Sequence, residues 1–233
     1  MTGFVIAIDG PSGSGKSTVS RLVASDCGLA YLDTGAMYRA ATWWCRHQGI
    51  DLRDEPRVRE AVAGMPLDMV TDPDEPRVVC GGHDITDAIR ESTLSQVVSQ
   101  VATNLGVRAE LQRRQREEIA AERTGGRSQG RGIIAEGRDI TTVVAPDAQV
   151  RILLIASEEA RLARRARELH GRVDDNVLAA TRDEVVRRDA DDATVSTFFT
   201  AADGVATIDS SRLDLAETVA AVRHVIAEAK GRT

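Results

Sequence analysis

The residues best suited to chemistry form a glycine-rich stretch near the N-terminus. Residues 10–17 read Gly-Pro-Ser-Gly-Ser-Gly-Lys-Ser, which matches the pattern G-x-x-x-x-G-K-[ST] without exception. Glycine lets the backbone curl so that consecutive N–H groups point at phosphate oxygens. The Lys16 ammonium can reach the terminal phosphates of a nucleoside triphosphate, and the Ser17 hydroxyl can bind a Mg²⁺ ion that bridges them. The stretch therefore predicts a loop that binds ATP with Mg²⁺.

The segments on either side are those that a phosphate-binding loop needs. Residues 4–8 are apolar, as a buried parallel strand requires, and apolar residues recur at helical spacing after residue 17. A helix beginning there adds its positive N-terminal end to the site. A plain glycine-rich turn is the alternative, and this strand–loop–helix context argues against it. The residues expected to bind ATP are Gly10, Pro11, Ser12, Gly13, Ser14, Gly15, Lys16, Ser17, Thr18 and, from a later helix, Arg161.

Two further stretches could hold a second phosphate. Residues 33–39 read Asp-Thr-Gly-Ala-Met-Tyr-Arg, where Thr34 lies at a predicted helix start and Arg39 about one turn later can make a bidentate phosphate contact. Residues 136–139 read Glu-Gly-Arg-Asp and follow a predicted strand, so their polar groups face the crevice where α/β proteins bind ligands. A helix capped by Thr34 and surface ion pairs are the alternative interpretations.

Arginines gather on two later predicted helices. Arg161, Arg164 and Arg165 lie early on one, and residues 187–192, Arg-Arg-Asp-Ala-Asp-Asp, end the other. Guanidinium groups aimed at a transferring phosphoryl group offset the charge of its transition state, and a mobile cover excludes water. We therefore expect a helical lid, although i,i+4 ion pairs such as Arg164 with Glu168 would produce the same pattern.

These stretches are positioned by strands that alternate with helices. Strands are expected over residues 4–8, 29–32, 132–135, 150–155 and 205–208. Helices are expected over residues 17–28, 33–47, 56–63, 94–102, 107–121, 158–169, 176–188 and 213–229. Such alternation is typical of a parallel sheet with helices on both faces. The predicted fold is therefore an α/β P-loop kinase with a five-stranded parallel sheet.

Residues 66–90 have a different pattern. Short apolar runs separated by Asp-Pro-Asp and Gly-Gly turns predict a small β insertion. The chain is therefore expected to be a single domain of residues 1–233. Its predicted parts are a core of about 1–33, 91–157 and 204–233, a monophosphate-binding insertion of about 34–90, and a lid of about 158–203.

Composition and charge exclude several classes of partner. The net charge is −6 at pH 7, and a negative surface repels a phosphate backbone, so no nucleic acid polymer is expected. No apolar run approaches the length of a membrane span, and no secretion signal is recognisable. The three cysteines form no C-x-x-C pair. We expect a cytoplasmic protein without a membrane partner, acting as a monomer.

The class of nucleotide-binding protein can also be narrowed. A GTPase would carry an N-K-x-D motif, but asparagine occurs only at Asn104 and Asn176, each before an apolar residue. A motor or regulatory switch would need effector modules, for which 233 residues leave little room. A kinase of a small acceptor, such as a nucleoside monophosphate, fits the length better.

The chain resembles the bacterial cytidylate kinase family over nearly its whole length. The stretches that carry the resemblance are residues 8–17, 33–39, 84–86, 89–90, Ser99, 107–108, 136–139 and 188–192. The first is shared widely among P-loop kinases, whereas D-T-G-A-M-Y-R together with G-R-D is much more specific. The resemblance implies transfer of the γ-phosphoryl group of ATP to CMP and dCMP.

The resemblance also implies roles for individual residues. These are Thr34, Arg39 and Arg138 on the acceptor phosphate, Ser99, Arg108 and Asp139 on cytosine, and Arg188 and Asp192 on the ribose side. Lys16, Arg138 and Arg188 would be the catalytic residues. An aspartate and an arginine suit cytosine because its exocyclic amine donates a hydrogen bond where uracil has a carbonyl.

Three departures from the family pattern keep alternatives open. Thr141 stands where the family usually has glycine, Val195 where it has an arginine that contacts phosphate, and Phe198-Phe199 where it has Pro-Leu. Arg187 or a lid arginine would have to replace the one absent at Val195. A kinase of UMP or another small acceptor, and a nucleotide-binding sensor that has lost catalysis, are therefore the alternative hypotheses.

Overall fold

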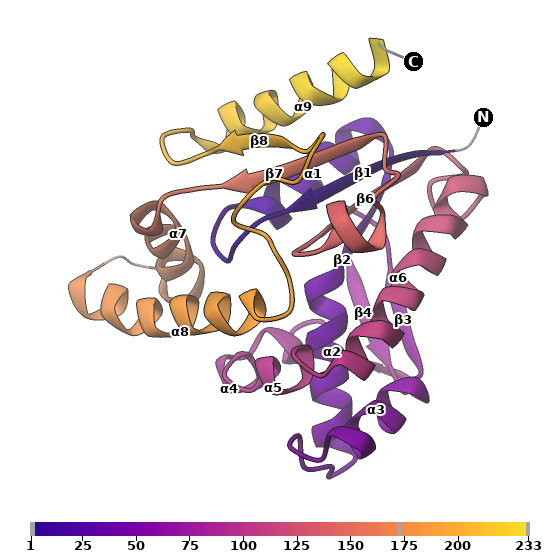
Figure 1. The fold of residues 1–233 in the computed structure, drawn as a ribbon, viewed down its shortest axis with the longest axis vertical. Helices are drawn as coiled ribbons and strands as arrows, with labels where there is room; N and C mark the ends of the chain where they lie inside the picture. Colours follow the sequence, from indigo (N-terminus) through magenta and orange to yellow (C-terminus); the bar gives the residue numbers. More distant parts are fainter. Residues whose placement is uncertain (1–2, 172–173, 232–233) are drawn as a thin grey trace.

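The computed structural model describes residues 3–171 and 174–231. Its central sheet contains five parallel strands: β1 (Phe4–Asp9), β2 (Ala30–Asp33), β6 (Gly132–Gly137), β7 (Val150–Ile155) and β8 (Ala206–Asp209). Their order across the sheet is β2-β6-β1-β7-β8 (Figure 1). The predicted α/β fold with a five-stranded parallel sheet is confirmed.

Strand β1 lies at the centre of the sheet and is covered on both faces. Val5 and Ala7 belong to the apolar cluster on one side, whereas Ile6 and Ile8 belong to the cluster on the other. Side chains alternate between the two faces of a strand, so a strand covered on both faces needs an uninterrupted apolar run. This burial fixes β1, and with it the start of the glycine-rich loop at the carboxyl edge of the sheet.

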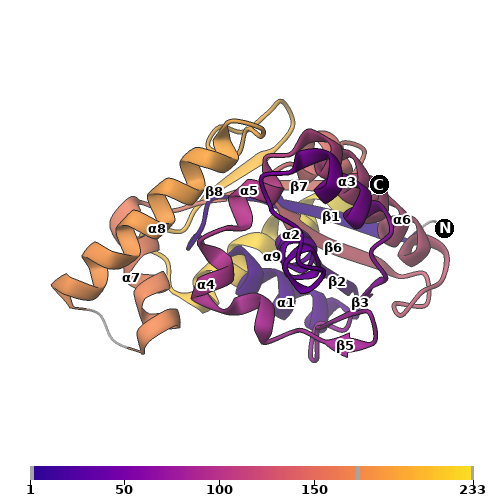
Figure 2. The same ribbon diagram turned by 90° about the horizontal axis from the view of Figure 1, so that it is seen from below.

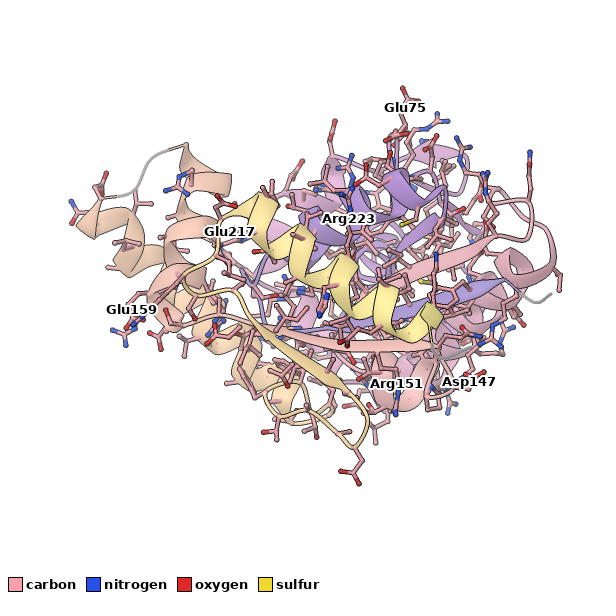
Figure 3. All side chains as sticks on the ribbon, turned by 90° about the horizontal axis from the view of Figure 1, so that it is seen from above. Glu75, Asp147, Arg151, Glu159, Glu217 and Arg223 are labelled. Atoms are coloured by element: carbon pink, nitrogen blue, oxygen red, sulfur yellow. The ribbon has the colours of Figure 1, made fainter. Side chains whose placement is uncertain are left out.

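Helices cover both faces of the sheet, as predicted. Helices α1 (Lys16–Cys27) and α9 (Leu215–Gly231) pack on one face, and α2 (Thr34–His47) and α6 (Leu105–Thr124) on the other. Figure 3 views the molecule from the side of α9, with Arg223 labelled on this helix. Arg223 forms an ion pair with Asp26 of α1, which joins the two helices at the surface.

The predicted β insertion is a separate antiparallel sheet. Helix α3 (Glu55–Ala63) precedes its three strands, β3 (Leu67–Val70), β4 (Arg77–Cys80) and β5 (His83–Asp84), which lie in the order β3-β4-β5. The apolar side chains of β4 join the same core cluster as α2 and α3. The small sheet thus packs against α2 and extends the apolar core on that side of the molecule.

The segment after the insertion differs from the single helix predicted over residues 94–102. It consists of a 3₁₀ turn, η1 (Ala88–Arg90), and two short helices, α4 (Ser92–Ser95) and α5 (Val98–Ala102). The backbone bends at Val97, which has a φ of −116°. With this bend Leu94, Val98 and Val101 are all buried. The free energy gained by burying these three side chains therefore exceeds that of continuing one straight helix.

Helices α7 (Glu158–His170) and α8 (Asp175–Ala193) lie beyond the carboxyl edge of the sheet (Figure 1, Figure 2). The Asp174 side chain caps α8 by accepting a hydrogen bond from Val177 N at 3.0 Å. The helix continues five residues beyond the predicted end at residue 188. Arg188, Asp189 and Asp192 all lie within α8, on the helix expected to carry them.

Two further features complete the frame. A π-helical turn, η2 (Ile140–Val144), directly follows the Glu-Gly-Arg-Asp stretch and was not predicted. Within residues 3–171 and 174–231, none of the helices combines the length and the apolar character needed to cross a bilayer.

The packing of α6 generates a stability prediction. Leu111 is 0% exposed in the core, whereas Leu105 on the same helix is 72% exposed. We expect Leu111→Ala to lower the free energy of unfolding by about 2–5 kcal/mol, because it removes buried methyl groups and leaves a cavity. Leu105→Ala, the matched control, should change it by less than about 0.5 kcal/mol. Urea denaturation measures both values, and equal losses would contradict this assignment of the core.

Candidate active site

The glycine-rich loop joins β1 to α1 and has the backbone of a phosphate-binding loop. Gly13 has a φ of +76° and Gly15 a φ of +90°, values that residues with a Cβ rarely adopt. A Cβ on Gly13 would also lie 2.6 Å from the Arg161 carbonyl oxygen. Lys16 is the first residue of α1, and its Nζ donates to the Pro11 carbonyl at 3.3 Å. The ammonium thus lies inside the loop that it would use to hold phosphate.

Two arginines of α7 hold this loop from behind. Arg161 donates to the carbonyl oxygen of Ser12 at 2.9 Å, and Arg164 to that of Ser14 at 3.1 Å. Arg164 also donates to the Ser210 carbonyl at 2.6 Å, which ties the loop to the end of β8. Both guanidinium groups bind carbonyls and so do not compete with an anion for the loop's N–H groups, of which that of Ser12 donates to Asp189 at 3.1 Å. Sequence reasoning placed Arg161 on ATP, and this structural contact was not foreseen.

A cleft of about 1400 Å³ runs from this loop to helices α2, α5 and α8. Most residues predicted to bind a ligand line it: Ser12, Gly13, Ser14, Gly15, Lys16, Ser17, Thr18, Thr34, Arg39, Arg108, Arg138, Asp139, Arg188 and Asp192. Gly10, Pro11, Ser99 and Arg161 do not line it. On α5 the cleft is instead lined by Val98 and Ala102, with Ser95 preceding them on α4. Ser99 is displaced because it follows Val98 and points to another side of the helix.

A buried carboxylate lies beneath the loop. Glu136 is 2% exposed at the end of β6 and accepts hydrogen bonds from Ser17 Oγ at 2.6 Å and Tyr31 Oη at 3.2 Å. Burial and the nearby charge of Asp33 raise the pKa of Glu136 to about 7, against the opposing effects of Lys16 and Ser17. Burial also lowers the pKa of Lys16. This carboxylate was quoted within a motif but was assigned no role from the sequence.

The start of α2 presents a second group of polar side chains. Asp33, not Thr34, caps the helix and accepts from Ala36 N at 2.9 Å. The Thr34 hydroxyl donates to the Glu136 carbonyl at 2.8 Å, which fixes α2 against β6. Arg39 pairs with Asp33 at 3.0 Å, but its buried Nε has no hydrogen-bond partner among the described residues. Although burial opposes it, Arg39 helps to lower the pKa of Asp33.

Arg138 lies between strand β6 and helix α8. Its guanidinium pairs with Asp189 at 2.7 Å and with Asp192 at 2.9 Å. The ring of Phe198 covers one side, with Cζ of Arg138 4.4 Å from the ring centroid. Asp189 and Phe198 were assigned no role from the sequence, because neither contact is local in the chain. Phe198 is completely buried, so its ring packs in the interior while one face contacts Arg138.

Arg188 adds a further, half-buried cation to the same hollow. Its Nε lies 3.8 Å from Asp192 and makes no hydrogen bond to the described residues. Burial, together with like-charge repulsion from Arg138 and Arg39, lowers the pKa of Arg188 to about 10, against the opposing effect of Asp192. An anion bound among Arg39, Arg138 and Arg188 would remove this repulsion. Val195, where the family resemblance predicts arginine, is half-buried on the segment between α8 and Phe198.

Asp139 lines the cleft beside Arg108. Its Oδ2 accepts from Arg108 Nη2 at 2.5 Å and from Gln112 Nε2 at 2.7 Å. Arg108 in turn stacks over Tyr38, with 5.5 Å between Cζ and the ring centroid. Gln112 was missed in the sequence, although its i,i+4 spacing from Arg108 on a predicted helix was a usable signal. Both donors end on the same oxygen, so Oδ1 is left for a ligand's donor.

Asp9 connects the loop to the Glu-Gly-Arg-Asp stretch. Its carboxylate accepts from Ile140 N at 2.9 Å, from Thr141 N at 2.8 Å and from Thr141 Oγ1 at 2.6 Å. Asp9 precedes Gly10, and Ile140 follows Asp139, so this clamp joins the two ligand-binding segments. The threonine at 141, unusual for the family, adds the side-chain hydrogen bond that glycine would lack.

The comparisons with known proteins agree with this arrangement. A family model described as cytidylate kinase matches residues 6–228. A protein named cytidylate kinase from Cutibacterium acnes is 51% identical over 224 residues, covering 96% of each chain. Proteins of the same name from Streptomyces avermitilis and Rhodococcus opacus are 43% identical over 226 residues and 42% over 232. These cover 96% and 98% of this chain, and 93% and 96% of theirs.

The clamp on Asp9 predicts a pH dependence. Burial raises the pKa of Asp9 from 3.8 to about 6, although hydrogen bonds from Thr141 and Ile140 oppose the shift. The folded protein therefore keeps this proton to higher pH than the unfolded chain does. Stability contributed by the protonated group is present below pH 3.8 and is lost as pH rises through about 6.

We expect the free energy of unfolding of the wild type, relative to Asp9→Asn, to fall on the order of 3 kcal/mol between pH 4 and pH 6.5. Denaturant titrations at several pH values measure this difference. Asp203→Asn, at an exposed aspartate, controls for loss of a charge alone. Parallel pH curves for the wild type and Asp9→Asn would contradict the burial of an ionisable Asp9.

Proposed function

The chain belongs to the cytidylate kinase family of ATP-dependent phosphotransferases, and we propose that it phosphorylates CMP and dCMP through the cleft described above. An oxygen of the acceptor monophosphate attacks the γ-phosphorus of ATP. The bond from that phosphorus to the β–γ bridging oxygen breaks, which yields ADP and CDP or dCDP. One observation carries the proposal: a single cleft joins the phosphate loop to a buried arginine cluster and then to Asp139.

At the donor end, the loop residues from Ser12 to Thr18 would bind the ATP phosphates. Their N–H groups and the N-terminal end of α1 attract the β- and γ-phosphates. Lys16 would shift from the Pro11 carbonyl to the γ-phosphate and offset the charge that develops on it. Arg161 and Arg164 support this by keeping the loop's carbonyls turned away from the nucleotide.

The donor set beside Lys16 fits Mg²⁺. The hydroxyl of Ser17 lies 2.6 Å from the carboxylate of Glu136, and Mg²⁺ prefers such oxygen ligands. The described residues contain no cluster of three or more histidine, cysteine or acidic side chains. This agrees with an ion that takes most of its ligands from phosphates and water. When bound, Mg²⁺ would neutralise charge on the β- and γ-phosphates. Ser17 would hold it, with Glu136 as its partner.

At the acceptor end, the buried arginines would bind the monophosphate. Arg39 and Arg188 each have a buried Nε without a hydrogen-bond partner among the described residues, and Arg138 lies beside Arg188. A phosphate placed among them would satisfy these donors and remove their mutual repulsion. Thr34 would contribute from the first turn of α2. Arg138 and Arg188 would then offset charge in the transition state.

Asp139 would recognise the base. The cytosine amine can donate to the Oδ1 atom, while Arg108 and Gln112 hold Oδ2. Uracil has a carbonyl at the same position, which would face a carboxylate without a proton between them. A role for Ser99 on the base stays a prediction, because Ser95 and not Ser99 lines the cleft.

Residues 158–203 would act as the lid, with 34–90 as the monophosphate-binding part and the remaining segments as core. Helices α7 and α8 lie over the carboxyl edge of the sheet, next to the loop (Figure 1). Their closure would exclude water, which would otherwise compete for the γ-phosphoryl group. Asp192 would contact the ribose side of the acceptor nucleotide. Action as a monomer stays a prediction.

A coupled assay of ADP release with CMP, dCMP, UMP and AMP tests the proposed function. We expect turnover with CMP and dCMP, strongly reduced with UMP and AMP, and absent when Mg²⁺ is chelated. Lys16→Ala should lower kcat by about 10³-fold or more while circular dichroism shows an intact fold. Preference for UMP or AMP would overturn the cytosine assignment. Failure of every acceptor to stimulate ADP release would favour a sensor.

Asp139→Asn tests how the base is recognised. Arg108 and Gln112 would hold the asparagine oxygen, so its amide nitrogen would face the ligand and match the uracil carbonyl. We expect the ratio of kcat/KM for CMP to that for UMP to fall by about 100-fold, with the KM for ATP unchanged. Asp147→Asn, at the exposed edge labelled in Figure 3, is the control. A fall in ATP affinity with unchanged selectivity would instead place Asp139 near the metal.

A further inference from the structure

We propose that Asp189 is a positioning residue that holds Arg138 and the phosphate loop in one fixed relation, so that the donor and acceptor subsites form together. Asp189 lies on α8 and is 3% exposed. Its Oδ1 accepts from Ser12 N at 3.1 Å and from Arg138 Nη1 at 2.7 Å. One carboxylate oxygen therefore bridges the loop that would hold ATP and the arginine that would hold the acceptor phosphate.

The second oxygen of Asp189 closes this bridge into a ring of contacts. Oδ2 accepts from Arg161 Nη1, and the same Nη1 donates to the Ser12 carbonyl at 2.9 Å. The N–H and the C=O of Ser12 are thus bound by Asp189 and Arg161 together. Of the residues next to Ser12, Pro11 has no N–H group to donate, and glycine at position 13 restricts the backbone least of all residue types. Asp189 and Arg161 therefore set the orientation of the backbone around Ser12.

Asp189 acts through its neighbours and does not contact the substrates. It does not line the cleft, whereas Arg138 and Asp192 do. Arg138 therefore meets two carboxylates with different surroundings. Asp192 borders the ligand space and can share Arg138 with an incoming phosphate, while Asp189 stays behind it. Phe198 covers a face of the same guanidinium, so Arg138 keeps its place while its ligands change.

The position of Asp189 also links α8 to the alignment of the two substrates for phosphoryl transfer. Phosphoryl transfer needs the attacking oxygen and the γ-phosphorus at a defined separation, and a misplacement of about 1 Å can cost about 100-fold in rate. The loop comes from β1 and Arg138 from β6, and a shared carboxylate couples both to the lid helix. Movement of α8 therefore shifts the two subsites as a unit rather than separately.

Asp189→Asn removes the charge and keeps the shape. The inference rests on the proposed transfer reaction but not on the identity of the base. We expect kcat to fall by about 100-fold because the two substrates are misaligned, with KM for CMP and for ATP changed by less than about threefold. The free energy of unfolding, measured in parallel, should fall, because Arg138 and Arg161 lose a shared buried carboxylate. The kcat values are therefore compared at a temperature at which circular dichroism shows the variant to be folded. Asp191→Asn, the same change two residues away on α8, should change kcat by less than about twofold.

A double-mutant cycle with Arg161→Lys examines the ring itself. Lysine keeps the positive charge, but it lacks the planar guanidinium with which arginine binds the Ser12 carbonyl and the Asp189 carboxylate together. If the residues act as one unit, the double variant should lose no more activity than Asp189→Asn alone. Should Asp189→Asn fail to fold, a tenfold or greater loss of kcat in a folded Arg161→Lys would still support the inference.

Three results would overturn it: an unchanged kcat in folded Asp189→Asn, fully additive losses in the cycle, or a loss confined to one substrate's KM. Wild-type turnover with CMP is measured first and reports on the proposed function separately. The ratio of variant to wild type, taken with whichever acceptor is used best, reports on Asp189.

Discussion

A buried guanidinium needs carboxylates around it, and the position of Arg138 follows from this requirement. Arg138 pairs with Asp189 and Asp192 of α8 and is covered by Phe198. To supply these partners, α8 must lie across the end of β6, and the chain after it must return under the lid before entering β8. Breaking such a buried pair by removing one partner is costly, since the other charge is left desolvated. The pairs that Arg138 forms therefore help to fix the location of the lid relative to the sheet.

The same hollow also holds arginine donors that its own carboxylates leave without hydrogen bonds. Arg39 and Arg188 keep buried Nε atoms without hydrogen bonds to the described residues, and burial together with like charge lowers the pKa of Arg188. Unsatisfied buried donors oppose folding, so an excess of them in one place is characteristic of a functional site. A phosphate monoester bound here would accept hydrogen bonds from these donors. It would remove a local instability of the fold, and the binding energy would then be available for closure and alignment.

Places where the structure departs from the sequence-based expectations share one cause. The helix expected over residues 94–102 bends because Leu94, Val98 and Val101 are buried together, and α8 runs past residue 188 because its last turn binds Arg138. The turn η2 follows Asp139 because Asp9 accepts its N–H groups. In each case a contact between residues far apart in the chain determines a local conformation. Propensity and periodicity, which describe only near neighbours, do not register such contacts.

By itself, the sequence determined the phosphate loop, the alternation of strands and helices, the antiparallel insertion and a set of candidate ligand-binding residues, most of which line the cleft. These depend on short spacings: glycines that permit a curled backbone, apolar runs that bury both faces of a strand, and a lysine at a helix start. Only the tertiary structure decided that Asp33 rather than Thr34 caps α2, that Gln112 orients Asp139, and that Asp189 joins Ser12 to Arg138. The partners in the last two pairs are 27 and 177 residues apart. Packing decides which aspartate pairs with which arginine, because the distance between two charged side chains is known only once the helices and strands that carry them have been placed.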